Sequence, residues 1–198
     1  MKKIIFAVLI ISGTQAFAQQ TRSHITAYGA LSAQYSKFNG QNAAFTGAYG
    51  GVLLNHKLLL GAGAYALTTK HRGYGLNESS HKPNNWRMGY AGLVTEYTFM
   101  ENKNIHFTAG ALVGGGIIKN GRGRGTIPQN GSDELKDIDA SGFYVVQPSV
   151  ALEVIAARWM RISAGVGYRY IAGADQPGIT NRDMSAPTAS LSFKFGLF

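Results

Sequence analysis

Four charged residues are unusual because they lie within stretches that otherwise alternate between apolar and small or polar side chains. These residues are Glu96, Glu153, Arg161 and Arg169. Opposite charges on one enclosed face are expected to form ion pairs, because an unpaired buried charge is costly. A set of such pairs either fills and rigidifies a polar interior or controls the passage of ions. Both interpretations stay open from the sequence, and both require elements that bring the four side chains onto one face.

A catalytic site would need a nucleophile with a histidine and a carboxylate within hydrogen-bond reach. The histidines are His24, His56, His71, His81 and His106. The segment Glu78-Ser79-Ser80-His81 has suitable residue types, but its spacing is not typical of a catalytic motif. We therefore expect no catalytic residues, no cofactor and no enzyme activity.

A long polar segment, 120–141, holds a different kind of chemistry. Arg122 and Arg124 alternate with glycines, an arrangement that suits the binding of phosphate groups. The second half of the segment is acidic, with Asp133, Glu134, Asp137 and Asp139. Carboxylates of this kind could bind a divalent cation, although Asp137 and Asp139 lack the full ligand spacing of a calcium loop, and we assign no metal site. A solvated surface loop of mixed charge is the alternative.

The elements that must position these residues are strands. From Tyr144 to Val154 the even positions are apolar, and the pattern resumes from Ile162 to Tyr170. Alternation over about ten residues is typical of a strand with one apolar and one polar face. We predict eight strands, over Ser23–Tyr35, Ala43–Leu54, Leu58–Thr69, Trp86–Met100, Ile105–Lys119, Gly142–Ile155, Trp159–Ala172 and Thr188–Phe198.

The connections between these strands alternate in length. Short turns are expected after Leu54, Met100 and Ile155, and longer connections over Ser36–Asn42, Lys70–Asn85, Asn120–Ser141 and Gly173–Pro187. An even number of antiparallel strands, with short turns at one rim and long loops at the other, is the plan of an up-and-down transmembrane β-barrel. That plan places the short turns in the periplasm and the long loops outside the cell.

Matching the faces of neighbouring strands predicts their register. Placing Glu153 opposite Arg161 pairs polar with polar positions and makes a cross-strand ion pair. In the preceding hairpin, placing Tyr97 opposite Phe107 likewise keeps apolar side chains on one face.

The first residues resemble an export signal. Lys2 and Lys3 precede the apolar run Ile4–Ile11, and Ala16-Phe17-Ala18 fits a small-x-small cleavage site. We expect residues 1–18 to be a cleaved signal peptide and residues 19–198 to be one barrel domain; an N-terminal anchor helix is the alternative. The chain has no Cys, which excludes disulfides and thiolate metal sites.

Alternation alone does not decide which face of the barrel is wet, because a soluble lipocalin-like barrel has an apolar interior. The polar faces here carry small residues, which suit the narrow lumen of eight strands. Aromatic residues also collect near both ends of the apolar face, as at the two interfaces of a membrane. They are Tyr35, Tyr144, Tyr168 and Tyr170 toward the long loops, and Tyr97, Phe99, Phe107 and Phe195 toward the short turns.

The net charge of +9 permits binding to polyanions. Export removes most opportunity to bind nucleic acid, so we expect no nucleic-acid partner. Anionic lipid headgroups and the phosphates of lipopolysaccharide are the more plausible counter-charges, with Arg122 and Arg124 as contacts. Loops that are merely solvated by their charges are an equally good explanation.

With this signal, this architecture and a terminal Phe198, the chain resembles the small eight-stranded outer-membrane proteins of the OmpX/OmpA-barrel type. The resemblance covers the mature chain and rests on no unique motif. It implies insertion by the outer-membrane assembly machinery, which reads an aromatic last strand, here Phe193, Phe195, Leu197 and Phe198. Phe198 is one residue out of phase with the other three.

The sequence therefore predicts a non-enzymatic, monomeric barrel of the bacterial outer membrane with a structural or surface-interaction role. Its expected partners are outer-membrane lipid, lipopolysaccharide and the assembly machinery. The alternatives are a porin-like channel for small solutes, a lipid-active outer-membrane enzyme and a soluble carrier.

Overall fold

The computed structural model describes residues 25–69, 71–73, 84–99, 104–121, 140–174 and 179–196. Several sites expected from the sequence lie outside these ranges. They are the signal peptide 1–18, the segment Glu78-Ser79-Ser80-His81, the pair Arg122 and Arg124, and the last two residues, Leu197 and Phe198.

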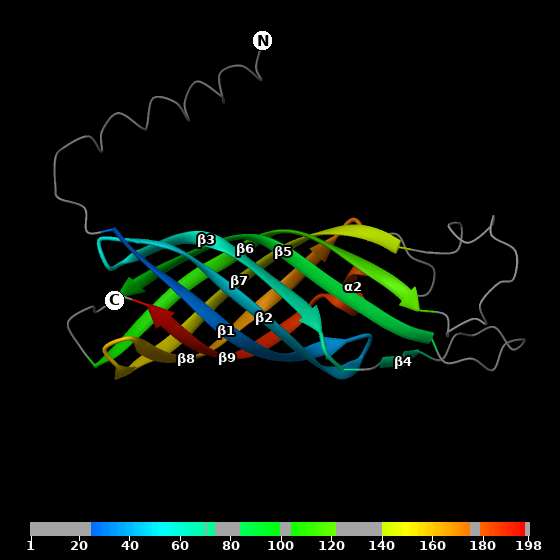
Figure 1. The fold of residues 1–198 in the computed structure, drawn as a ribbon. Helices are drawn as coiled ribbons and strands as arrows, with labels where there is room; N and C mark the ends of the chain where they lie inside the picture. Colours follow the sequence, from blue (N-terminus) through cyan, green and yellow to red (C-terminus); the bar gives the residue numbers. More distant parts are fainter. Residues whose placement is uncertain are drawn as a thin grey trace, which may run out of the picture.

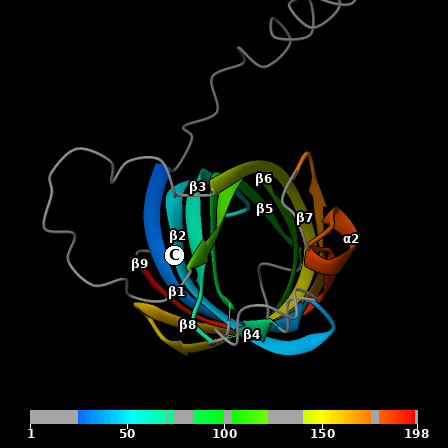
Figure 2. The ribbon, with the colours of Figure 1, turned by 90° about the vertical axis from the view of Figure 1, so that its right-hand side faces the viewer.

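Eight long antiparallel strands form a closed barrel (Figures 1 and 2). They are β1 (Ile25–Phe38), β2 (Gln41–Leu54), β3 (Leu58–Leu67), β5 (Asn84–Phe99), β6 (Ile105–Gly121), β7 (Ala140–Ala157), β8 (Met160–Ala172) and β9 (Ala186–Gly196). Pairing of β1 with β9 and of β3 with β5 closes the ring. The predicted all-β class and eight-stranded antiparallel barrel are confirmed.

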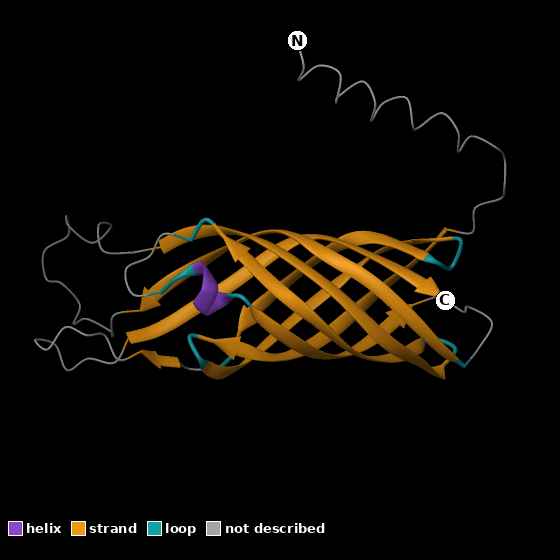
Figure 3. Cartoon of the chain, turned by 180° about the vertical axis from the view of Figure 1, so that it is seen from behind, coloured by secondary structure: helices purple, strands orange, loops and turns teal. Residues whose placement is uncertain are grey.

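Two short elements lie at one rim of the barrel. Strand β4 (His71–Gly73) pairs with β5 beyond the end of β3, and helix α2 (Asn181–Met184) precedes β9. Figure 3 shows the helix at the rim opposite the tight β2–β3 and β7–β8 turns. Within the described ranges, no helix is long and apolar enough to cross a membrane.

The rim with α2 is called the long-loop end below, and the opposite rim the short-turn end. One connection at the long-loop end is shorter than the sequence predicted. Residues 36–42 do not form a loop, because β1 continues to Phe38 and β2 begins at Gln41. Only Asn39 and Gly40 form the turn, with φ angles of 51° and 73°. Two positive φ angles favour a type I′ hairpin turn, for which Asn-Gly is a preferred sequence.

The predicted register of the β7–β8 hairpin is wrong by two residues. Glu153 lies opposite Ser163, not opposite Arg161. The turn contains only Arg158 and Trp159, and an irregularity next to it absorbs one residue of β7. A shift of two residues leaves every side chain on its predicted face, so the inward and outward assignments remain correct.

The β5–β6 hairpin shows the same kind of error. Tyr97 lies opposite Ala109, two residues from the predicted partner Phe107. Apolar side chains occupy the outward face in either register. Matching the apolar faces of two strands therefore excludes registers that are one residue apart. It does not decide between registers that are two residues apart.

The outward face of the barrel is an apolar band. Large exposed hydrophobic side chains project from all eight long strands, and Leu93 is 74% exposed. On β6 the band runs from Ile105 to Ile117, which at about 3.3 Å per residue and a tilt of about 40° spans roughly 30 Å. The aromatic residues expected at its two ends are all exposed, with Tyr144 at 75%.

The inward face is not uniformly small and polar. Its long-loop half is filled by the apolar plug, a cluster of fourteen buried side chains. The plug consists of Phe38, Ala43, Phe45, Tyr65, Trp86, Met88, Tyr90, Leu112, Ile118, Phe143, Val145, Ile171, Ile179 and Met184. Ile179 and Met184 belong to the α2 connection, so this connection contributes two side chains to the apolar plug.

Candidate functional site

The short-turn half of the lumen contains an ion cluster made of Glu96, Glu153, Arg161 and Lys194. Lys194 lies between the two carboxylates, with its Nζ 2.5 Å from Glu96 Oε1 and 2.5 Å from Glu153 Oε2. Arg161 Nη1 donates a hydrogen bond of 2.9 Å to Glu153 Oε1. Two carboxylates and two cations give the ion cluster no net charge, which is the condition for burying it at tolerable cost.

Four different strands supply the ion cluster, one residue each from β5, β7, β8 and β9. Arg161 and Lys194 are direct cross-strand partners, so two like charges lie side by side in the wall. The carboxylate of Glu153 bridges them and turns this repulsive arrangement into a connected chain of charges. Lys194 is 1% exposed, as is Glu153.

Two further side chains, Tyr28 and His106, lie next to the ion cluster. Tyr28 Oη donates a 2.9 Å hydrogen bond to Glu96 Oε1. His106 is buried with its Nδ1 3.7 Å from Glu153 Oε1, beyond hydrogen-bond distance. Neither ring nitrogen of His106 has a hydrogen-bond partner among the described residues.

Arg169 is separate from the ion cluster and lies at the long-loop end. Its Nε donates to the carbonyl of Met184, and its Nη2 donates to Ser36 Oγ and to the carbonyl of Lys37. The guanidinium also lies 4.2 Å from the ring centroid of Phe45. Arg169 therefore ties the α2 connection to β1 at the closed rim instead of joining a charge network.

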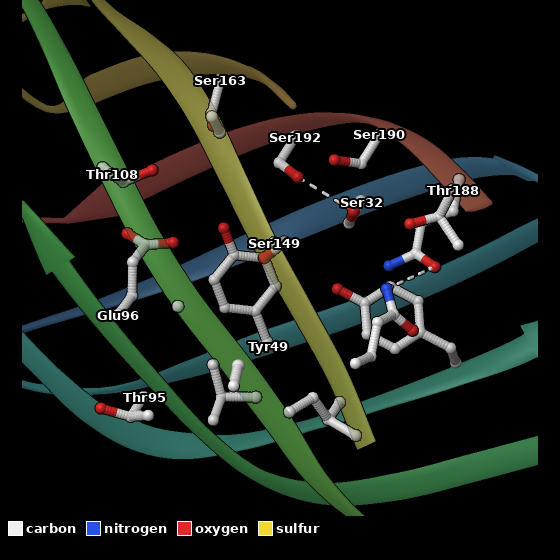
Figure 4. A pocket seen from close by; sticks show the side chains of 18 residues that line it. Ser32, Tyr49, Thr95, Glu96, Thr108, Ser149, Ser163, Thr188, Ser190 and Ser192 are labelled. Atoms are coloured by element: carbon white, nitrogen blue, oxygen red, sulfur yellow. Dashed lines mark hydrogen bonds between the residues drawn. The ribbon is translucent and has the colours of Figure 1, made fainter. Parts of the chain in front are cut away.

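Figure 4 shows a small polar cavity in the lumen. Glu96 of the ion cluster and Tyr65 and Leu112 of the apolar plug line it, so it lies between the two clusters. Its volume is about 60 Å³, and Ser32, Ser149, Ser163, Ser190 and Ser192 are among the residues that line it. At about 30 Å³ per water, it has room for about two water molecules.

The amide side chains of Gln34 and Gln147 line this cavity on the side of the apolar plug, and the phenol of Tyr90 joins them. The hydroxyl of Tyr90 lies 2.8 Å from Gln147 Oε1 and 3.1 Å from Gln34 Oε1, and Gln147 Nε2 donates to Gln34. The lumen is thus filled in sequence by charges, a small wet space, amides and apolar side chains. This order can hold water or a small ion, and eight strands leave room in the lumen for little more than side chains.

The structure brings together three of the four charged residues singled out in the sequence, since Glu96, Glu153 and Arg161 share the ion cluster. Lys194 completes it and was missed. The signal for Lys194 was its place on the polar face of the last strand, in phase with Ser190 and Ser192. The sequence offered no means of knowing that β9 closes against β8 with Lys194 beside Arg161.

The remaining sequence-predicted sites are placed only in part. Phe193 and Phe195 of the last strand point outward, and Trp159 stacks on Phe195 with ring centroids 6.1 Å apart. In the described part of the chain, no group of three or more metal-ligating side chains comes together.

Comparison with known proteins identifies the fold and nothing narrower. No protein-family model matches the sequence, and no curated protein matches it. Among solved structures, Neisserial surface protein A aligns with a TM-score of 0.56 and 11% identity, over 87% of this chain and 96% of that one. Ail, the attachment invasion locus protein of Yersinia pestis, solved with the heparin analogue sucrose octasulfate, aligns with a TM-score of 0.52 and 10% identity, over 89% of this chain and 100% of that one. The chain therefore has the fold of the small eight-stranded outer-membrane β-barrels.

Proposed function

We propose that this chain is a non-enzymatic, integral β-barrel of the bacterial outer membrane that acts through its surface and its loops. The observation that carries the proposal is the combination of an apolar band on the outside with a lumen that is packed with side chains on the inside. An exposed band about as tall as the hydrocarbon core of a membrane suits lipid and is unsuited to water. Because the lumen is filled, the outward face and the loops are the surfaces that can interact with other molecules.

The expected export signal supports an orientation for the barrel. Residues 1–18 would deliver the chain to the periplasm, and insertion from that side leaves the short turns there and the long loops outside. The outward aromatic residues of the last strand, Phe193 and Phe195, with Leu197 and Phe198 after them, would then be read by the assembly machinery. We expect a monomer, because closure of β1 on β9 leaves no long strand edge unpaired.

Gel mobility of an isolated outer-membrane fraction tests the proposal. The unboiled protein should be present in that fraction and should migrate differently from the boiled protein, because a closed barrel resists SDS until it is heated. Recovery as a detergent-free soluble protein with no mobility shift would contradict the proposal. Such an outcome would favour the soluble-carrier alternative.

The polar cavity favours a second candidate function, a channel for small solutes. It would require the ion cluster and the apolar plug to move apart from the path together, since they flank the cavity on its two sides. Conductance in planar bilayers distinguishes this candidate from the first. A lipid-active enzyme is distinguished by altered lipid A on overexpression, with the alteration lost in the His81→Ala variant.

A further inference from the structure

The outward face of the strands carries charge at only one end. Among strand residues with described side chains, its charged members are Lys37, Arg87 and Lys119, all of them basic. Each lies in the last two outward positions before the long-loop end. On this face of the described strands no carboxylate accompanies them, because Glu96 and Glu153 point into the lumen.

Two of these cations are direct neighbours. Arg87 on β5 is the cross-strand partner of Lys119 on β6, which places their Cβ atoms about 5 Å apart. Like charges directly opposite one another destabilise a sheet unless a counter-charge joins them. Neither side chain forms an ion pair with a described residue, and Arg87 is exposed. In the ion cluster the comparable pair, Arg161 and Lys194, is bridged by Glu153.

The position of the pair relative to the apolar band indicates where its counter-charge comes from. Lys119 lies two residues beyond Ile117, the last large apolar side chain of the band on β6, or about 7 Å farther along the strand. The exposed Tyr144 of the neighbouring β7 marks the same end of the band. Lipid phosphates lie at this depth, just outside the hydrocarbon region.

We propose that Arg87 and Lys119 form a binding site for a phosphate group of a phosphorylated membrane glycolipid, the lipid A part of lipopolysaccharide. The Arg87 guanidinium presents a fork of donors that matches two phosphate oxygens, and the Lys119 ammonium supplies a second cation beside it. The acyl chains would lie against Ile117 and Leu93 below. The site rests on the proposed outer-membrane location, and it uses other residues than the phosphate contacts expected at Arg122 and Arg124.

The test is binding of fluorescent bisphosphorylated lipid A to the whole barrel in a zwitterionic detergent. Replacing both cations, Arg87→Gln with Lys119→Gln, should weaken binding about tenfold. The matched control is Lys37→Gln, which removes an outward cation of the same rim that has no cationic partner across the strand and should change binding less than twofold. Removing the phosphates from lipid A should weaken its binding to the unaltered barrel. The loss should equal the loss caused by replacing both cations.

Two results would overturn the inference. One is equal affinity of the double variant and the unaltered barrel for lipid A. The other is equally strong competition by phosphatidylglycerol, which would assign the site to any anionic headgroup. Heat-dependent gel mobility of each variant separates these results from misfolding. The unaltered barrel could be found in the outer membrane and shift on heating, yet bind lipid A no better than the double variant does. That result would contradict this inference and leave the proposed function intact.

Discussion

Lys194 is the residue on which the ion cluster depends most, since its ammonium contacts both Glu96 and Glu153. Lys194→Met keeps the length of the side chain but leaves two buried carboxylates with Arg161 as their sole cluster cation. Breaking a buried ion pair by removing one partner costs about 3–5 kcal/mol, so the free energy of unfolding should fall by that amount. The urea midpoint of unfolding in detergent measures the change.

The control for this prediction is Lys37→Met, which makes the same substitution on the exposed outward face and should leave the midpoint almost unchanged. Adding Glu96→Gln to Lys194→Met should restore part of the lost stability, because it removes one of the uncompensated charges. A midpoint that is equally low with and without Glu96→Gln would show that packing around Lys194, and not its charge, was lost.

Arg169 supports a second prediction at this scale. Lysine keeps the charge but lacks the fork that reaches Met184, Ser36 and Lys37 together. Arg169→Lys should therefore destabilise the barrel by about 2 kcal/mol and loosen the α2 connection first. Faster protease cleavage near α2, with Arg87→Lys as the exposed control, is the expected observation. Cleavage at the unaltered rate would mean that Ile179 and Met184 hold the connection without Arg169.

At the scale of elements, the Asn39-Gly40 turn offers a clean test of backbone conformation. Gly40 has φ of 73°, and an added Cβ there would meet no atom within 4 Å. Any cost of Gly40→Ala therefore comes from the left-handed backbone, about 1 kcal/mol. Gly29→Ala is the control, because an added Cβ there also meets no close atom and no positive φ is involved. Equal unfolding midpoints for the two variants would contradict this account.

The same turn shows what the sequence could and could not predict about the elements. Alternation placed all eight long strands, because one face is apolar and points outward while the other lines the lumen along their whole length. It misjudged residues 36–42 because Lys37, Asn39 and Asn42 look like a loop, although Lys37 and Asn42 continue the alternation. Register was predicted only up to a two-residue shift, since both registers match the faces and the turn decides between them.

The lumen could be predicted less well than the wall. Glu153 and Arg161 were recognisable because they lie on neighbouring strands of one hairpin. Lys194 and Glu96 meet across the barrel, 98 positions apart in the chain, so their contact depends on closure of the ring. The apolar plug was not predicted from the sequence. Its large members, such as Phe38 and Phe143, occur at strand ends, where an aromatic residue is expected to mark the membrane interface.

The whole molecule is a barrel that is closed in two physically different ways. At the short-turn end, charges of opposite sign hold one another across four strands, beside a small buried apolar cluster of Tyr28, Leu53 and Leu59. At the long-loop end, apolar side chains and the α2 connection fill the space by packing. A polar cavity with room for about two waters separates the ion cluster from the apolar plug. Because the closures share no residue, weakening one should leave the other in place.

This independence leads to a prediction about conductance in planar bilayers. The unaltered barrel should show no conductance steps, and Lys194→Ala with Glu96→Ala should show none either, because the apolar plug still closes the path. Steps should appear only when plug residues are truncated in addition, for example Phe143→Ala and Ile118→Ala, since water then gains a continuous route through the cavity. The plug variant alone is the matched control, and the ion cluster should keep it closed. Steps in the unaltered barrel that change with Arg161→Ala or Glu153→Ala would instead establish the channel, with the ion cluster as its gate.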